Sequence, residues 1–186
     1  MEYNINIRVS NRHVHLTKEV YDKLFNEEID IRNSLSQIGE FASNKTVTIK
    51  NGDRKIENVR VVGPFRTYNQ VEISKRDARL LELNPPVRKS GDLGGSLEIT
   101  LETDINNIKV TGLIIAKRHV HMNKEDANKY GVLDGQIVGL KIGGDKSAIL
   151  DAEVKISDNG IFEAHIDTDD ACATLVEDND KVKMIV

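Results

Sequence analysis

Cysteine and tryptophan are the scarcest residues in this 186-residue chain, which has one cysteine, Cys172, and no tryptophan. A single cysteine cannot form an intramolecular disulfide, and it cannot build a zinc site from several thiolates. Aromatic residues make up only 4% of the chain. The core must therefore be aliphatic, built from Val, Ile and Leu.

Long apolar runs are also missing, since no segment approaches the roughly 18 residues of a membrane span. The first residues carry no apolar signal region and lead directly into an alternating pattern. We therefore expect a cytoplasmic protein without a membrane partner. The net charge of −4 gives no long-range attraction to nucleic acid. An anionic ligand would need local positive charge from a metal ion or from arginines.

Strand patterns dominate what is present. An Asn51-Gly52 turn between two alternating segments predicts a hairpin. Further short strand patterns, separated by polar turns, favour barrels or sandwiches. Short helices are expected after the capping residues Thr17, Ser74 and Asn123, with a weaker one from Asp167 to Leu175. The Gly-rich segment 90–96 lacks the spacing of a nucleotide-binding loop and is interpreted as a turn.

An internal repeat is the most informative feature. Arg12-His-Val-His15 recurs as Arg118-His-Val-His121, 106 positions later, with similar residues on both sides. On a β-strand, residues i and i+2 project from the same face, so two imidazoles of such a pair can converge on one metal ion. Neutral imidazole is a good zinc ligand. Surface or hydrogen-bonded histidines left by duplication are the alternative interpretation.

Three further residues are candidates for the same sites. His165 could complete a three-histidine site with His119 and His121, and Glu72 could be the third ligand beside the other pair. Arg66, in a Gly-Pro turn, could present its planar fork to a phosphate or a carboxylate. Taken alone, each of these residues is as well explained by an ordinary structural or surface role.

The chain resembles the PduL-type phosphotransacylases (phosphate propanoyltransferases) over nearly its whole length. The resemblance rests on motifs in the same order and spacing: Arg12-His-Val-His15, Leu35-Ser-Gln37, Gly63-Pro-x-Arg66, Gln70-Val-Glu-Ile-Ser74, Pro85-Pro-Val-Arg-x-Ser-Gly-Asp92, Lys117-Arg-His-Val-His-Met122 and His165-Ile-Asp-Thr-Asp169.

The resemblance implies a mainly β protein of two β-barrel domains, capped by short α-helices and related by internal duplication. Residues 1–11 and 117–186 would form the first barrel, and residues 12–116 the second. It also implies two zinc ions per chain at the interface between barrels. His13, His15 and Glu72 would hold the zinc that meets the coenzyme A sulfur, and His119, His121 and His165 would hold the zinc nearer phosphate.

The same resemblance implies that Arg66 binds phosphate and acts in catalysis, and that Ser10, Arg60 and Val62 contact coenzyme A. Asn33, Ile38 and Cys172 depart from the family pattern near the expected coenzyme A contacts. The extra amphipathic N-terminal segment of microcompartment-targeted members is not seen, so a free cytosolic member is expected. Related proteins suggest a homodimer.

The expected activity is that of a zinc-dependent phosphate acyltransferase. It would interconvert acetyl-CoA or propanoyl-CoA plus phosphate with acyl phosphate plus coenzyme A, by direct attack of phosphate on the thioester. A zinc hydrolase acting on an ester or a phosphate, and a non-catalytic metal-binding scaffold, are the rival interpretations. The sequence leaves open the preferred acyl chain, the physiological direction and the oligomeric state.

Overall fold

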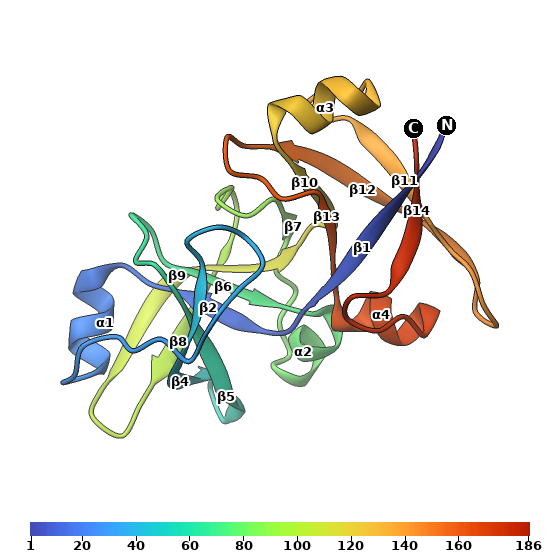
Figure 1. Ribbon diagram of the computed structural model, residues 1–186. Helices are drawn as coiled ribbons and strands as arrows, with labels where there is room; N and C mark the ends of the chain where they lie inside the picture. The colour runs from blue at the N-terminus through green and yellow to red at the C-terminus, as the bar shows by residue number, and fades with distance from the viewer. The chain divides into compact units, whose positions relative to one another are not determined.

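The computed structural model describes all residues, 1–186, as fourteen strands and four short helices (Figure 1). The chain forms two compact units. Unit 1 comprises Met1–Asn11 and Lys117–Val186, and unit 2 comprises Arg12–Ala116.

Unit 1 is a closed six-stranded barrel in the order β1-β13-β10-β12-β11-β14. Its elements are β1 (Glu2–Ser10), β10 (His119–Met122), α3 (Lys124–Tyr130), β11 (Ile137–Ile142), β12 (Ala148–Ile156), β13 (Glu163–Asp167), α4 (Thr168–Thr174) and β14 (Lys181–Ile185). In Figure 1 the blue strand β1 runs beside the red strand β14, with which it pairs.

Unit 2 also closes on itself, because β4 pairs with both β5 and β8 and the pairings continue through β2, β6 and β9. Its elements are β2 (His13–His15), α1 (Lys18–Leu24), β3 (Asn33–Ser34), β4 (Phe41–Asn51), β5 (Arg54–Gly63), β6 (Gln70–Ile73), α2 (Lys75–Leu80), β7 (Val87–Arg88), β8 (Leu97–Glu102) and β9 (Asn107–Ala116). The short β3 and β7 pair with β4 and β9. The prediction of a mainly β protein of two barrels is confirmed.

The two barrels share one pattern of strand pairing. The histidine strand of each, β2 or β10, pairs in parallel with one neighbour (β5 or β12) and antiparallel with the other (β6 or β13). That second neighbour then pairs in parallel with β9 or β1. In unit 1, β1 therefore occupies the place that β9 occupies in unit 2, although β1 lies at the start of the chain. The internal repeat is therefore a repeat of structure as well as of sequence.

Alternating burial explains why these segments are strands. In β14, Val182 and Met184 are buried while Lys181 and Lys183 are exposed, as expected for a strand with one face on a core. The hairpin of β4 and β5 turns at Asn51-Gly52, where Gly52 has a φ of 56° that glycine adopts without strain. Each barrel has its own cluster of buried aliphatic residues.

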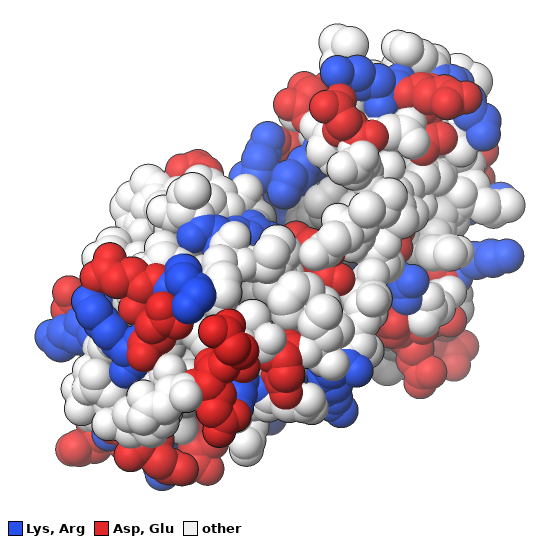
Figure 2. Space-filling view, turned by 60° about the vertical axis from the view of Figure 1, so that its left-hand side comes forward, with Lys and Arg blue, Asp and Glu red and all other residues white.

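The helices begin where side chains cap them. Thr17, Ser74, Asn123 and Asp167 each accept a hydrogen bond from the backbone N–H three residues later. No helix is long and apolar enough to cross a membrane. Lysine and arginine atoms are interspersed with those of aspartate and glutamate over the face in Figure 2, in keeping with the small net charge.

Candidate metal centres

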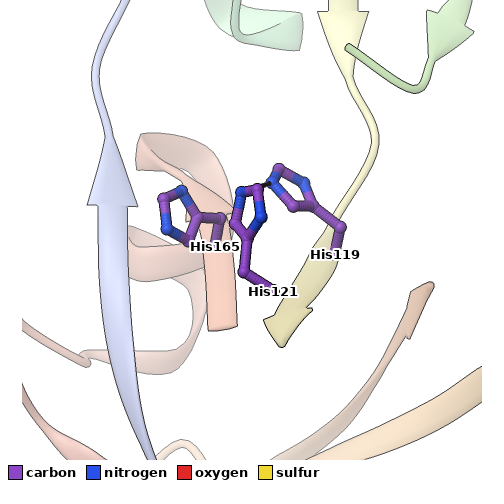
Figure 3. A group of neighbouring side chains, drawn as sticks. All are labelled: His119, His121 and His165. Atoms are coloured by element: carbon purple, nitrogen blue, oxygen red, sulfur yellow. Dashed lines mark hydrogen bonds between the residues drawn. The ribbon is translucent and has the colours of Figure 1, made fainter. Parts of the chain in front are cut away.

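Three histidines meet in unit 1. β10 supplies His119 and His121, and β13 supplies His165, which lies opposite His119 in the antiparallel register (Figure 3). The ring centroids are 4.6 to 5.0 Å apart, and the Nε2 atoms of His119 and His121 are 3.0 Å apart. Alternation places i and i+2 of β10 on one face, and the register brings the third ring to it.

The protonation of this group suits a metal ion. Nδ1 of His119 lies 2.9 Å from the carbonyl oxygen of Lys117, which can only accept, so Nε2 holds the lone pair. Burial, followed by the neighbouring His119 and His165, lowers the pKa of His121 to about 2, so this ring stays neutral. The buried Nδ1 of His121 has no hydrogen-bond partner. Three imidazoles whose rings face one another, together with an unsatisfied buried nitrogen, fit a zinc ion.

The second group lies in unit 2 and consists of His13 and His15 from β2 and Glu72 from β6. Glu72 lies opposite His13 in the register, and its Oε2 is 3.7 Å from Nε2 of His13. Nδ1 of His15 donates to the carbonyl oxygen of Val62 at 3.2 Å, which leaves Nε2 with a lone pair. Two imidazoles and a carboxylate are also a common zinc donor set.

Arg66 is connected to this second group by hydrogen bonds. Its Nη1 donates to Tyr68 Oη at 2.9 Å and to Ser90 Oγ at 3.3 Å. Ser90 also accepts from the amide of Gln70, which donates to Glu72. The remaining arm of the guanidinium, Nη2, is 2.8 Å from Glu40 Oε1. One arm of the Arg66 guanidinium therefore binds a carboxylate in this structure.

Sequence reasoning missed four polar residues around this group: Glu40, Tyr68, Gln70 and Ser90. Ser90 and Gly91 belong to the segment interpreted as a turn, and the structure brings that turn to Gln70, whose Oε1 accepts from the Gly91 N–H at 2.8 Å. Gln70, the first residue of β6, is completely buried, and its place in the motif Gln70-Val-Glu-Ile-Ser74 was the available signal.

The residues expected to contact coenzyme A have different surroundings. Arg60 donates hydrogen bonds to the carbonyl oxygens of Ser43 and Asn44, both at 3.0 Å. Val62 is buried, and its carbonyl oxygen accepts the hydrogen bond from Nδ1 of His15. Ser10 ends β1 in unit 1, whereas Arg60 and Val62 lie in unit 2.

The arginine that begins each repeated motif has a structural contact. Arg12 bonds Asp77 at 3.1 Å, and Arg118 bonds Asp170 at 2.9 Å. Each aspartate is the third residue after a helix N-cap, Ser74 or Asp167. The motif arginines therefore tie a histidine strand to the helix that follows the third candidate ligand.

Each barrel carries a candidate metal-binding group that contains a His-x-His pair, and comparison with known proteins gives the family. The family model for phosphate propanoyltransferase matches residues 6–177. The chain is 43% identical to a phosphate propanoyltransferase of Thermotoga maritima, over 99% of this chain and 90% of that protein. It is 40% identical to one of Shewanella putrefaciens, over 98% and 88%, and 41% identical to one of Clostridioides difficile, over 91% and 83%. The chain belongs to the phosphate propanoyltransferase family, whose members are phosphate acyltransferases.

Proposed function

We propose that the protein is a zinc-dependent phosphate acyltransferase that interconverts acetyl-CoA or propanoyl-CoA plus phosphate with acyl phosphate plus coenzyme A. Family membership supports the acyl transfer. The observation that carries the zinc dependence is the pair of candidate metal groups, one in each barrel, in which hydrogen bonds from Nδ1 to carbonyl oxygens assign Nε2 of His119 and of His15 as the ligand nitrogen.

The first group, His119, His121 and His165, and the second group, His13, His15 and Glu72, would each hold one zinc ion. When bound, zinc supplies a Lewis acid that polarises a thioester carbonyl and stabilises a departing thiolate. Lewis acidity of this kind suits a direct attack of phosphate on the thioester, in which no nucleophilic side chain takes part.

Arg66 would bind the phosphate. Its guanidinium is already held by Tyr68 and Ser90, and Nη2 is paired with a carboxylate whose two oxygens resemble two oxygens of phosphate. We infer that phosphate replaces Glu40 on this arm. Holding phosphate in place converts a two-molecule encounter into a reaction within one complex.

In the proposed reaction a phosphate oxygen forms a bond with the thioester carbon. The carbon–sulfur bond then breaks, and coenzyme A leaves as a thiolate that takes up a proton. The reverse reaction follows the same path. No acyl-enzyme intermediate is required, and neither Ser10 nor the exposed Cys172 is assigned a covalent role. Contacts of Ser10, Arg60 and Val62 with coenzyme A remain predictions, as do a homodimer and a cytoplasmic location.

The test is thiol release from acetyl-, propanoyl- and butanoyl-CoA, with and without phosphate, before and after zinc is removed by a chelator. We expect release that requires phosphate, yields acyl phosphate, stops on chelation and returns with added zinc. Equal release without phosphate would identify a zinc hydrolase instead. Full activity after complete zinc removal would refute the metal dependence. No release under any condition would point to a scaffold.

A further inference from the structure

One position is matched in the two barrels without being a candidate ligand in either. It lies two residues before the third ligand on the same strand, and it holds Gln70 in β6 and Glu163 in β13. Gln70 lies opposite His15, and Glu163 lies opposite His121. Both side chains are buried, with exposed fractions of 0% and 3%. A buried amide and a buried carboxylate at equivalent places call for a physical reason.

Glu163 lies between two donors. Its Oε1 is 2.9 Å from Nε2 of His165, and its Oε2 is 3.0 Å from Nε of Arg8. An ionised carboxylate can only accept hydrogen bonds, so Nε2 of His165 carries the hydrogen. The nitrogen left with a lone pair is then Nδ1. Glu163 thereby selects the tautomer and fixes the orientation of the third imidazole, as carboxylates commonly do beside metal-binding histidines.

Arg8 supplies the charge that makes this burial tolerable. Its Nη1 donates to Asp178 at 3.2 Å and also to Asn179, and the Val9 N–H donates to Asp178 at 3.0 Å. A buried carboxylate without a cation would be strongly destabilising, whereas one with a hydrogen-bonded arginine is compensated. β1 therefore contributes to the histidine group through Arg8, although it carries none of the candidate ligands.

Gln70 lies between two acceptors and one donor. Its amide nitrogen donates to Glu72 Oε1 and to Ser90, and its amide oxygen accepts from the Gly91 N–H. An amide provides both functions, whereas a carboxylate there would face Glu72 with like charge. An uncharged amide needs no cation beside it. In unit 1 the residue of β1 paired with His165 is Arg8, whereas in unit 2 the residue of β9 paired with Glu72 is the apolar Ile114.

We propose that Glu163 is a positioning residue for the metal group of unit 1, supported by Arg8, and that Gln70 has the same task in unit 2. The type of positioning residue depends on the third candidate ligand. An imidazole such as His165 is held by a hydrogen-bond acceptor, and a carboxylate such as Glu72 is held by a donor. The proposal rests on the proposed function, because it presumes that the three histidines bind zinc.

Zinc affinity is the direct test. In a His13→Ala/His15→Ala background, which leaves only the unit 1 group, zinc binding is measured by competition with a chromophoric chelator, and cobalt binding by visible absorption. Glu163→Gln should weaken zinc binding by about 10-fold or more, within the 10–100-fold range typical of such partners. The amide offers one acceptor to two donors, so one contact is always lost. Glu163→Ala should weaken binding further, and both variants should change the cobalt spectrum.

Glu2→Gln is the matched control. It lies on β1 like Arg8 and loses an exposed ion pair with Lys141, but it does not contact a histidine. Zinc affinity and the cobalt spectrum should be unchanged. Arg8→Gln should reproduce a weakened form of the Glu163→Gln effect, because the carboxylate loses its partner.

The outcomes separate the two hypotheses. If the background protein with intact Glu163 binds no zinc, the proposed metal role of the three histidines fails. If it binds zinc, and Glu163→Gln and Glu163→Ala bind zinc and cobalt with unchanged affinity and spectra, the positioning role is wrong. A lower melting temperature of the metal-free variants with unchanged zinc affinity would assign Glu163 and Arg8 to fold stability alone.

Discussion

The two candidate metal groups occupy equivalent places in equivalent barrels, yet they differ in formal charge. Three neutral imidazoles would leave a bound divalent ion with its full charge of +2, whereas Glu72 would reduce the charge of the other centre to +1. The bound ion is commonly the largest local charge in a site. The two barrels therefore share a scaffold, while the third candidate ligand would give the two centres different electrostatic environments.

The surroundings of the groups differ as well. Arg66 lies four residues before Gln70, and the residue four before Glu163 is Asn159. Unit 2 therefore has a guanidinium connected to its group, by way of Ser90 and Gln70, at a place where unit 1 has an amide. Similar backbones do not imply similar chemistry. Single substitutions at matched positions can therefore show whether the two groups have different roles.

Loss of a histidine should have the largest effect. His13→Ala and His119→Ala should each remove one zinc ion and lower kcat/KM by about 1,000-fold, since metal stabilisation is worth several kcal/mol. We expect His13→Ala to weaken coenzyme A binding more, and His119→Ala to affect phosphate use more. Elemental analysis and separate titrations measure both. If both variants retained two zinc ions and near-normal turnover, we would conclude that the His-x-His pairs are remnants of duplication without a metal-binding role.

Arg66→Ala should come next. Removal of a charge-assisted, forked contact should lower kcat/KM for phosphate by about 100-fold, with little change in coenzyme A binding. Arg66→Lys should recover only part of the loss, because an ammonium lacks the planar fork. Asn159→Ala, at the matched position of unit 1, is the control and should leave phosphate kinetics unchanged. Steady-state kinetics with varied phosphate decide between these expectations.

The motif arginines should behave alike in both barrels. Arg12→Gln and Arg118→Gln each remove a partly exposed ion pair with an aspartate in the first turn of a helix. Each should lower the free energy of unfolding by about 1 kcal/mol without changing zinc content. Denaturant unfolding and elemental analysis check this. Loss of zinc in only one of the variants would show that its arginine supports a metal group.

Glu40→Gln should have the smallest effect and the opposite sign. Without the carboxylate, Nη2 of Arg66 is free of a charged competitor, so the KM for phosphate should fall by about two- to threefold, as expected for a partly exposed ion pair. Phosphate-dependent kinetics of wild type and variant measure the change. A rise in KM would mean that Glu40 holds Arg66 in its binding geometry.

Much of this comparison was accessible from sequence. The alternation of β14 and the Asn51-Gly52 turn are local signals, and strand periodicity alone predicts that the two histidines of each His-x-His pair share one face. The contact of His165 with His119 depends on the register of β13 against β10, which residues far apart in sequence determine. The resemblance to a family provided that pairing in advance.

Positioning residues are harder to predict because their task depends on what surrounds them. Glu163 and Gln70 look like ordinary strand residues until both of their neighbours are known. The Glu40–Arg66 pair joins residues from separate segments of unit 2, and no local pattern relates them. Side-chain partners of this kind come from tertiary structure, which strand periodicity does not encode.

The place of β1 has a consequence for protein synthesis. All residues of the second group lie between positions 13 and 72, so they leave the ribosome early. Arg8 can pair with Glu163 only after a further 155 residues have been synthesised. At ordinary rates of translation, the interval between residue 72 and residue 165 is roughly 5 to 20 s. Limited proteolysis of stalled nascent chains of increasing length would follow the order of folding. The N-terminal strand spends that interval without its neighbours, so one metal group can be assembled while the other does not yet exist.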